Sequence, residues 1–203
     1  MNKEITRCGW VTSDPDYLAY HDNEWGKPLK DSLQLFELIC LEGQQAGLSW
    51  LTILKKREGY RKCFHQFDPV KIAEMDEDDV EKLMQDPAIV RNRAKINAII
   101  HNARAYLKMA EQKEDFCEFI WQFVDNDPQV NHWKTRAEVP VKTDHSDALS
   151  KALKKRGFKF IGSTTCYAFM QAAGLVDDHI ANCLCRKIKN VEKLKTEKLK
   201  INA

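Results

Sequence analysis

Five residues in the N-terminal part of the chain combine aromatic rings with one carboxylate. The rings belong to Trp10, Tyr20, Trp25 and Trp50, and the carboxylate belongs to Glu42. Indole faces attract a planar cation, and a phenol or a carboxylate can accept hydrogen bonds from exocyclic N–H groups. These residues are therefore candidates for a pocket that binds a flat cation. The alternative is that the tryptophans are ordinary core residues and that Glu42 is solvated.

Two cysteines and two histidines at opposite ends of the chain are the donor types that zinc prefers. Cys8 and His21 lie near the start, and His179 and Cys183 form an HxxxC pair near the end. On a helix this pair would share one face, whereas Cys185 would point elsewhere. Such a set suits a closed, structural zinc site that ties the two ends of the chain together. The alternative is that the thiols are buried core groups and the histidines incidental.

A basic hairpin, residues 154–165 with the sequence KKRGFKFIGSTT, has the composition of a phosphate-binding turn. Glycine between two helices lets backbone N–H groups approach a DNA phosphate without interference from side chains. Positive charge around it would add a salt-sensitive attraction. The cations are Lys154, Lys155, Arg156 and Lys159. The alternative is an ordinary helical hairpin with a solvated basic face.

The elements that must position these residues are predicted to be helices, because apolar residues recur at spacings of three and four. A buried, central helix is predicted to begin at Asp31 or Ser32 and to end at Gly43. Glu42 then lies in its last turn, where the helix dipole disfavours a carboxylate, and such violations tend to be functional. The segment before this helix is predicted to have no helix of its own.

Start and stop signals predict the remaining helices. They begin at Ser49 and at the Asp68–Pro69 pair, and three more cover roughly 78–86, 90–110 and 115–124. Residues 125–144 are predicted to be a long loop, or a short helix between loops, and a seam between two helical lobes. Ser146 is predicted to cap a helix that Gly157 closes, so that residues 146–174 form a helix, a hairpin and a second helix.

Composition limits what else the chain can be. Its 203 residues suit one domain, assigned to 1–186, followed by a basic and mobile tail at 187–203. A formal net charge of +2 permits a basic patch but not a uniformly basic surface. Seven cysteines without a secretion signal argue against disulfides. No apolar run approaches the roughly 18 residues of a membrane span, so we expect a cytoplasmic monomer without membrane contact.

Long stretches of the chain follow a family pattern. They are RCGWV, YHDNEWG, FELICLEGQQAGLSW, FHQFDPVKI, SDALSKALKKRGFKFIG and GLVDDHIANC, and they cover most of residues 7–183. Together they resemble the constitutive bacterial 3-methyladenine DNA glycosylase I family of the helix-hairpin-helix glycosylase superfamily. The resemblance implies an all-α, helix-hairpin-helix glycosylase fold with a zinc site joining the N- and C-terminal segments. It also implies a monofunctional enzyme that flips 3-methyladenine out of alkylated double-stranded DNA and hydrolyses its glycosidic bond, which releases free 3-methyladenine.

The resemblance assigns roles to the candidate residues. The implied ligands of one structural zinc ion are Cys8, His21, His179 and Cys183. The implied base pocket consists of Glu42 as a catalytic residue, Tyr20 and Trp50 against the base, and Trp10 and Trp25 around them. The implied DNA anchor spans residues 157–165, with contacts from Gly157, Lys159, Gly162, Ser163 and Thr164.

A VDDH segment, residues 176–179, places Asp177 where many members of the superfamily carry VDTH. In those relatives the aspartate stabilises the sugar cation or helps to activate water, so Asp177 is a candidate catalytic helper. In the branch specific for 3-methyladenine this carboxylate is not thought essential. Asp177 is alternatively a helix-capping residue.

Two other functions compete with this one. A bifunctional glycosylase and lyase needs an amine nucleophile two residues after the last glycine of the hairpin, where this chain has Thr164. Such lyases often also carry four cysteines for an iron–sulfur cluster after the aspartate, whereas only Cys183 and Cys185 follow it here. A non-enzymatic, zinc-stabilised helix-hairpin-helix DNA-binding module would need the basic hairpin but not a carboxylate among indoles.

Overall fold

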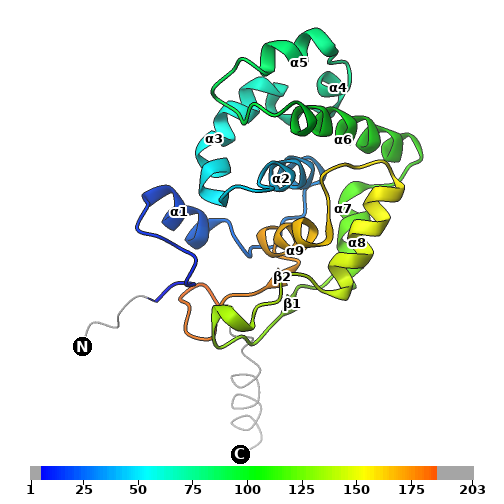
Figure 1. The fold of residues 1–203 in the computed structure, drawn as a ribbon. Helices are drawn as coiled ribbons and strands as arrows, with labels where there is room; N and C mark the ends of the chain where they lie inside the picture. Colours follow the sequence, from blue (N-terminus) through cyan, green and yellow to red (C-terminus); the bar gives the residue numbers. More distant parts are fainter. Residues whose placement is uncertain (1–5, 187–203) are drawn as a thin grey trace, which may run out of the picture.

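The computed structural model describes residues 6–186, which are mostly helical (Figure 1). The α-helices are α1 (Pro15–Asn23), α2 (Ser32–Gln44), α3 (Trp50–Cys63), α4 (Pro69–Ala73), α5 (Glu77–Leu83), α6 (Arg93–Glu111), α7 (Phe116–Trp121), α8 (Asp144–Lys155) and α9 (Ser163–Ala172). The 3-10 turns are η1 (His65–Phe67), η2 (Gln122–Val124) and η3 (Arg136–Glu138). The predicted all-α class therefore holds except for one short parallel pair, β1 (Gln129–Val130) with β2 (Val176–Asp177).

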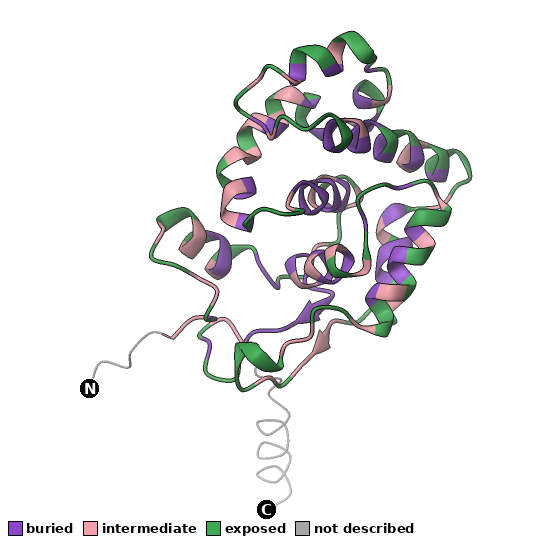
Figure 2. Cartoon of the chain, viewed as in Figure 1, coloured by how far each residue is buried: buried purple, intermediate pink, exposed green. Residues whose placement is uncertain are grey.

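Helix α2 lies in the middle of the molecule and packs against α3, α6, α7 and α9 (Figure 1). It begins as predicted, because the Asp31 carboxylate caps the backbone N–H of Gln34 at 2.8 Å. It runs one residue beyond the predicted end, so Gly43 lies inside its last turn. Most of its length is buried, as its apolar density predicted (Figure 2).

The N-terminal segment contains a helix, which corrects the prediction that it has none. Helix α1 starts with proline at its first position, and the Asp14 side chain caps the N–H of Asp16 at 3.0 Å. Tyr20 and His21 form its buried face. The helix was missed because its nine residues are polar on balance and lack an apolar stripe.

The C-terminal third differs from the prediction in two details and agrees with it in a third. Helix α8 is capped by Thr143 and not by Ser146. Ser146 is the third residue of the helix, and its side chain completes a capping box with Thr143. Gly157, at φ +97°, closes the helix as predicted. Residues 178–186 form turns and not the helix that the HxxxC spacing assumed.

The predicted seam is bound to the chain that follows α9. The N–H of Gln129 donates to the carbonyl of Leu175 at 2.9 Å, and that of Asn131 donates to Asp177 at 3.1 Å. The predicted tail, 187–203, lies outside the described residues. None of the helices within 6–186 is long and apolar enough to cross a membrane.

The end of α9 contacts the chain that leaves α1, and this contact requires glycine. Gly174 has φ +68°, and a Cβ there would lie 2.4 Å from the backbone carbon of Lys27 and 2.5 Å from the nitrogen of Pro28. In the same contact, the backbone N–H of Leu29, which follows Pro28, donates to the carbonyl of Ala173 at 3.0 Å. The contact therefore fixes α1, which carries Tyr20 and His21, relative to α9.

We expect Gly174→Ala to lower the free energy of unfolding by about 1–3 kcal/mol, because the methyl group would overlap a backbone that is itself held in place. Gly47→Ala is a matched control, since Gly47 also has positive φ (+76°) but its Cβ would meet nothing within 4 Å. It should lose only the conformational strain of about 1–2 kcal/mol. Denaturant titration of both variants measures the difference, and equal losses would contradict the steric explanation.

Candidate active site

A cavity of about 330 Å³ opens between α1, the end of α2, the start of α3 and α9. Each predicted pocket residue lines it: Trp10, Tyr20, Trp25, Glu42 and Trp50. Other walls come from α9 and from the segment that carries η3: Tyr167, Gln171, Arg136, Val139 and Val141. The structure therefore brings together, in one cavity, residues that are forty positions apart in the sequence.

Glu42 is the unusual polar group of this cavity. Its side chain is 4% exposed, and its Oε2 atom has no hydrogen-bond partner. Burial raises the pKa of this carboxyl from 4.5 to about 8. The indole Nε1 of Trp50 is likewise buried without a partner. Buried polar atoms are nearly always paired, so these two atoms are the groups of the cavity wall that a bound molecule could pair with.

Lys95 explains how the end of α2 accommodates a carboxyl group. Its buried ammonium group donates to the carbonyl oxygens of Gln44 at 2.8 Å and Ala46 at 2.7 Å. These are the carbonyls that a helix end leaves without partners, and the positive charge offsets the negative end of the helix dipole. Sequence reasoning missed Lys95, because it lies on α6, fifty-one residues beyond Gln44.

Aromatic rings form a continuous wall from the cavity to the histidines. The ring of Tyr20 lies 5.4 Å from that of Trp50, and the rings of Trp10 and Trp25 are 5.0 Å apart. The Trp25 ring lies 4.6 Å from His179. Burial raises the pKa of Tyr20 well above its ordinary value, so its hydroxyl keeps its proton. The wall is therefore neutral and apolar, with hydroxyl and indole N–H donors at its edges.

A second carboxylate, Asp178, lines the cavity, and Asp177 is not among the lining residues. The Oδ1 atom of Asp178 accepts from Asn131 at 2.6 Å and from the Trp133 indole at 2.7 Å. Its Oδ2 accepts from the Tyr167 hydroxyl at 2.6 Å and from Gln171 at 2.7 Å. Four donors thus share the two oxygens of this carboxyl group. Asp178 thereby ties the η3 segment to α9, a role that the VDDH spacing alone does not reveal.

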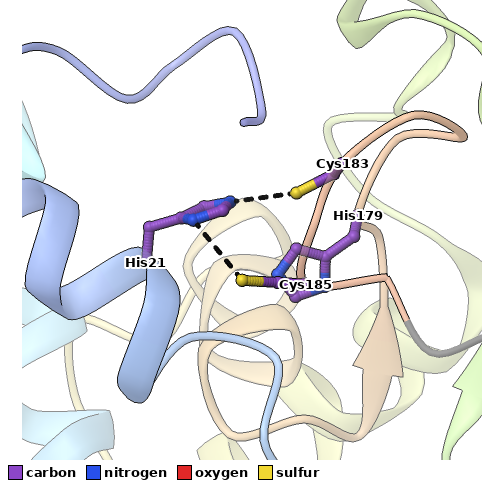
Figure 3. Close-up of side chains that lie close together, drawn as sticks. All are labelled: His21, His179, Cys183 and Cys185. Carbon is purple, nitrogen blue, oxygen red and sulfur yellow. Dashed lines mark hydrogen bonds between the residues drawn. The ribbon is translucent and has the colours of Figure 1, made fainter. Parts of the chain in front are cut away.

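Histidines and cysteines from both ends of the chain meet beside this wall (Figure 3). Ligand atoms of His21, His179, Cys183 and Cys185 lie within 4.8 Å of one another. His21 Nε2 is 3.4 Å from the Cys183 sulfur. Cys8 joins them through a hydrogen bond with Cys183, which lowers the pKa of Cys183 and raises that of Cys8. Three of the predicted ligands, His21, His179 and Cys183, thus meet through turns rather than on one helical face, and the fourth, Cys8, contacts Cys183.

Cys185 also lies in the cluster, which corrects the prediction that its side chain points away from His179 and Cys183. Its sulfur is 3.9 Å from Nδ1 of His21 and 3.8 Å from the Asp22 carboxylate. Cys183 contacts the opposite ring nitrogen, Nε2. Because Nδ1 of His21 is 2.7 Å from Asp22, that nitrogen is occupied. The ligand atoms that lie within 4.8 Å of one another are those of His21, His179, Cys183 and Cys185, and the predicted ligand Cys8 is outside this group although it is hydrogen-bonded to Cys183.

The basic hairpin is held from two sides. Asn102, on α6, accepts from the N–H of Lys159 at 2.7 Å and donates to its carbonyl at 3.3 Å. Ser150, on α8, donates to the carbonyl of Ile161 at 2.7 Å. Helix α9 then starts at Ser163 with Gly162 as an N-cap, which provides no capping side chain. Its first N–H groups therefore remain available to an external acceptor.

Not all the predicted hairpin cations are free. Arg156 forms a two-point ion pair with Glu114, with an Nε–Oε2 distance of 2.9 Å, and its guanidinium lies 4.0 Å from the centre of the Phe119 ring. Lys154, Lys155 and Lys159 are exposed. The positive charge of the hairpin therefore comes from the lysines, and Arg156 fastens the end of α8 to the chain before α7.

The fold and site are those of a DNA base glycosylase. The model for the family described as methyladenine glycosylase matches residues 10–187. The chain is 66% identical over 181 residues to DNA-3-methyladenine glycosylase 1 of Escherichia coli, covering 89% of this chain and 97% of that protein. It is 60% identical over 181 residues to DNA-3-methyladenine glycosylase of Haemophilus influenzae, covering 89% and 98%. A crystal structure of 3-methyladenine DNA glycosylase I matches with TM-score 0.89 at 62% identity, covering 90% of this chain and 100% of that one. The chain belongs to the methyladenine glycosylase family.

The raised pKa of Glu42 predicts how stability depends on pH. Between 4.5 and about 8 the folded protein keeps a proton that the unfolded chain has lost. The contribution of Glu42 to the free energy of unfolding should therefore be fully present below pH 4.5 and fall as the pH rises through this window. Glu42→Gln removes the titrating group. The stability of this variant relative to wild type should therefore increase with pH inside the window, by about 1.4 kcal/mol per pH unit.

Denaturant titration at several pH values between these limits tests the prediction. Glu74→Gln, the same change at an exposed glutamate, is the control and should follow the wild-type curve. A Glu42→Gln curve parallel to wild type would show that the buried carboxyl is not protonated in the folded state.

Proposed function

We propose that this chain excises 3-methyladenine from alkylated double-stranded DNA by hydrolysis and has no lyase activity. The observation that carries the proposal is the buried, unpaired carboxyl of Glu42 inside an aromatic pocket. Methylation at N3 gives adenine a delocalised positive charge. A cationic base stacked on Trp50 would supply the partner that Glu42 lacks, since a neighbouring positive charge favours the ionised carboxylate.

The chemistry follows from the charge of the leaving group. A base inside a duplex must be flipped out before a pocket can hold it. The bond between the base and deoxyribose then breaks with its electron pair moving to the base, which neutralises the base and leaves the positive charge on the sugar. Water adds to the sugar carbon and releases a proton to solvent, which gives the neutral abasic sugar. Because the base departs without prior protonation, the enzyme gains most from a site that holds the departing base. Glu42 and Tyr20 are assigned to hydrogen bonds with its edge, and Trp10 and Trp25 to the enclosing wall.

The competing functions are less well supported. A DNA-binding module without catalysis has no reason to bury a carboxyl group among indoles. A lyase needs an amine nucleophile, and Thr164, which lines the cavity, offers a hydroxyl instead. The relatives named above are glycosylases, which also favours the excision reaction.

We expect Glu42→Gln and Trp50→Ala each to slow single-turnover excision of 3-methyladenine from methylated DNA about ten- to a hundred-fold. A charge-assisted hydrogen bond contributes about 1.5–3 kcal/mol, which corresponds to that range. The wild-type rate should also rise with pH toward about 8, where Glu42 ionises, and the Glu42→Gln rate should not.

Glu74→Gln is again the matched control, and every variant is first shown to be folded. Wild-type excision by Glu42→Gln, with the same pH profile, would remove Glu42 from the reaction. A failure of the wild-type protein to release 3-methyladenine, combined with normal DNA binding, would favour the non-enzymatic module.

The basic hairpin is assigned to a DNA phosphate, through Gly157, Lys159 and the open helix end at Gly162, Ser163 and Thr164. Its N-terminal N–H groups carry the positive end of the α9 dipole, which favours an anion. Phosphate contacts position a protein on DNA without reading its sequence. The hairpin is therefore expected to determine affinity and not base selection.

We expect Gly162→Asp to weaken binding to DNA strongly and to leave binding of free 3-methyladenine intact. The new carboxylate would both crowd and repel the phosphate. Gly162→Ala is the control, because a Cβ there meets nothing within 4 Å and the fold should accept it. Fluorescence titrations with labelled DNA and with the free base give both affinities; equal loss of both would indicate misfolding.

The His/Cys cluster is assigned to one structural zinc ion held by Cys8, His21, His179 and Cys183. Zinc prefers four nitrogen and sulfur donors in this kind of closed site. The buried Nε2 of His179 has no partner in the protein, as a metal ligand would require. The ion would hold together segments that the chain separates by more than 150 residues, and its binding energy would contribute directly to folding.

A further inference from the structure

The two histidines of the cluster are held in the same way, each by an aspartate one or two residues away in the chain. Nδ1 of His21 lies 2.7 Å from the carboxylate of Asp22. Nδ1 of His179 lies 2.7 Å from Oδ1 of Asp177, which also accepts the backbone N–H of His179 at 3.1 Å. A carboxylate at Nδ1 places the ring proton there, so the lone pair is on Nε2.

The Nε2 atoms are the ring nitrogens that the aspartates leave available, and in His21 this nitrogen faces Cys183 while Cys185 lies on the Nδ1 side. His21 Nε2 is 3.4 Å from the Cys183 sulfur, and His179 Nε2 is buried without a partner. Both rings are therefore in the tautomer and orientation that a metal ion requires. Asp177 and His179 are 2% and 3% exposed, so water does not compete for their hydrogen bond.

The same geometry separates Asp177 from the base pocket. Asp178, the next residue, lines the cavity, whereas Asp177 does not. Successive side chains of an extended segment point to opposite sides, and Asp177 is the last residue of β2. One aspartate of the VDDH segment therefore belongs to the pocket wall and the other to the histidine.

We propose that Asp177 is a positioning residue for the zinc ligand His179 and not a helper in excision. The inference rests on the zinc site proposed above. Asp22 acts in the same manner on His21 and is itself held by Arg7, whose Nε donates to it at 2.8 Å. In each case the carboxylate fixes the ring and increases its basicity toward the metal.

The test measures how fast zinc leaves the purified, full-length protein for an excess of a chromogenic chelator. Loss of a residue that orients a metal ligand typically weakens metal binding about ten- to a hundred-fold. We expect Asp177→Ala to release zinc faster by that order. Asp177→Asn keeps an oxygen acceptor for Nδ1–H but loses the charge, so its release rate should fall between those of Asp177→Ala and wild type.

Asp76→Ala is the control for stability alone. Asp76 caps α5, at the far end of the molecule from the cluster (Figure 1), and its loss should destabilise the fold by about 1 kcal/mol without a change in zinc release. Excision by the zinc-loaded variants, measured in a single turnover, provides the second readout. Asp177→Ala should be much less impaired there than Glu42→Gln.

The outcomes separate this inference from the proposals beneath it. Absence of stoichiometric zinc from the wild-type protein would overturn both the zinc site and the role of Asp177. Zinc in the wild type, with release from Asp177→Ala no faster than from wild type, would overturn only the positioning role. Retained zinc with excision more impaired in Asp177→Asn than in Glu42→Gln would make Asp177 the catalytic helper that its superfamily position suggests.

Discussion

The buried carboxyl group of Glu42 is the constraint on which the arrangement of the pocket depends. An unpaired carboxyl inside a protein is unfavourable, and its pKa of about 8 expresses that cost as a proton retained near neutrality. The fold reduces the penalty without removing it. Lys95 neutralises the carbonyl end of the same helix, but its ammonium group is committed to Gln44 and Ala46 rather than to Glu42. The carboxyl is left free to meet a cation that enters the cavity.

The aromatic wall of the cavity packs directly against the histidine cluster, so a movement of one would displace the other. Trp25 packs on His179 at 4.6 Å, and Trp10 lies 5.2 Å from His21. The N–H of Leu184 donates to the carbonyl of Thr6 at 3.0 Å, which joins the two chain ends beside the cluster. In the proposed zinc site, an ion bound to the histidines would therefore also restrain the indoles behind the pocket. A preformed pocket loses less entropy when the base enters.

The starts and ends of helices could be predicted from the sequence, because they depend on adjacent residues. The Asp31 and Ser49 caps, the Asp68–Pro69 start and the Gly157 stop each depend on a few adjacent residues, and each was predicted. The pocket residues were grouped by type before their contacts were known, and the structure brings them together.

Features that depend on distant pairing were not predictable in this way. Lys95 and Asn102 act on carbonyls and N–H groups about fifty residues away, and nothing in their own neighbourhoods marks them. The four donors to Asp178 come from α9 and from a segment forty-five residues upstream. In the His/Cys cluster, His179 and Cys183 do lie together, but turns and not a helix bring them there, and Cys185, which the helical spacing directed elsewhere, joins them.

Direct contact between the basic hairpin and helix α2 sets the distance from the hairpin to the pocket. Gly43 follows Glu42, and a Cβ at Gly43 would lie 3.2 Å from the carbonyl oxygen of Phe160 and 3.3 Å from its Cβ. The hairpin therefore rests on the last turn of α2, while Asn102 holds it from the other side. In the proposed function, a phosphate bound at the hairpin would place the flipped nucleotide at a fixed distance from Glu42. The closeness of α2 to the hairpin, rather than a flexible loop, then determines which nucleotide reaches the pocket.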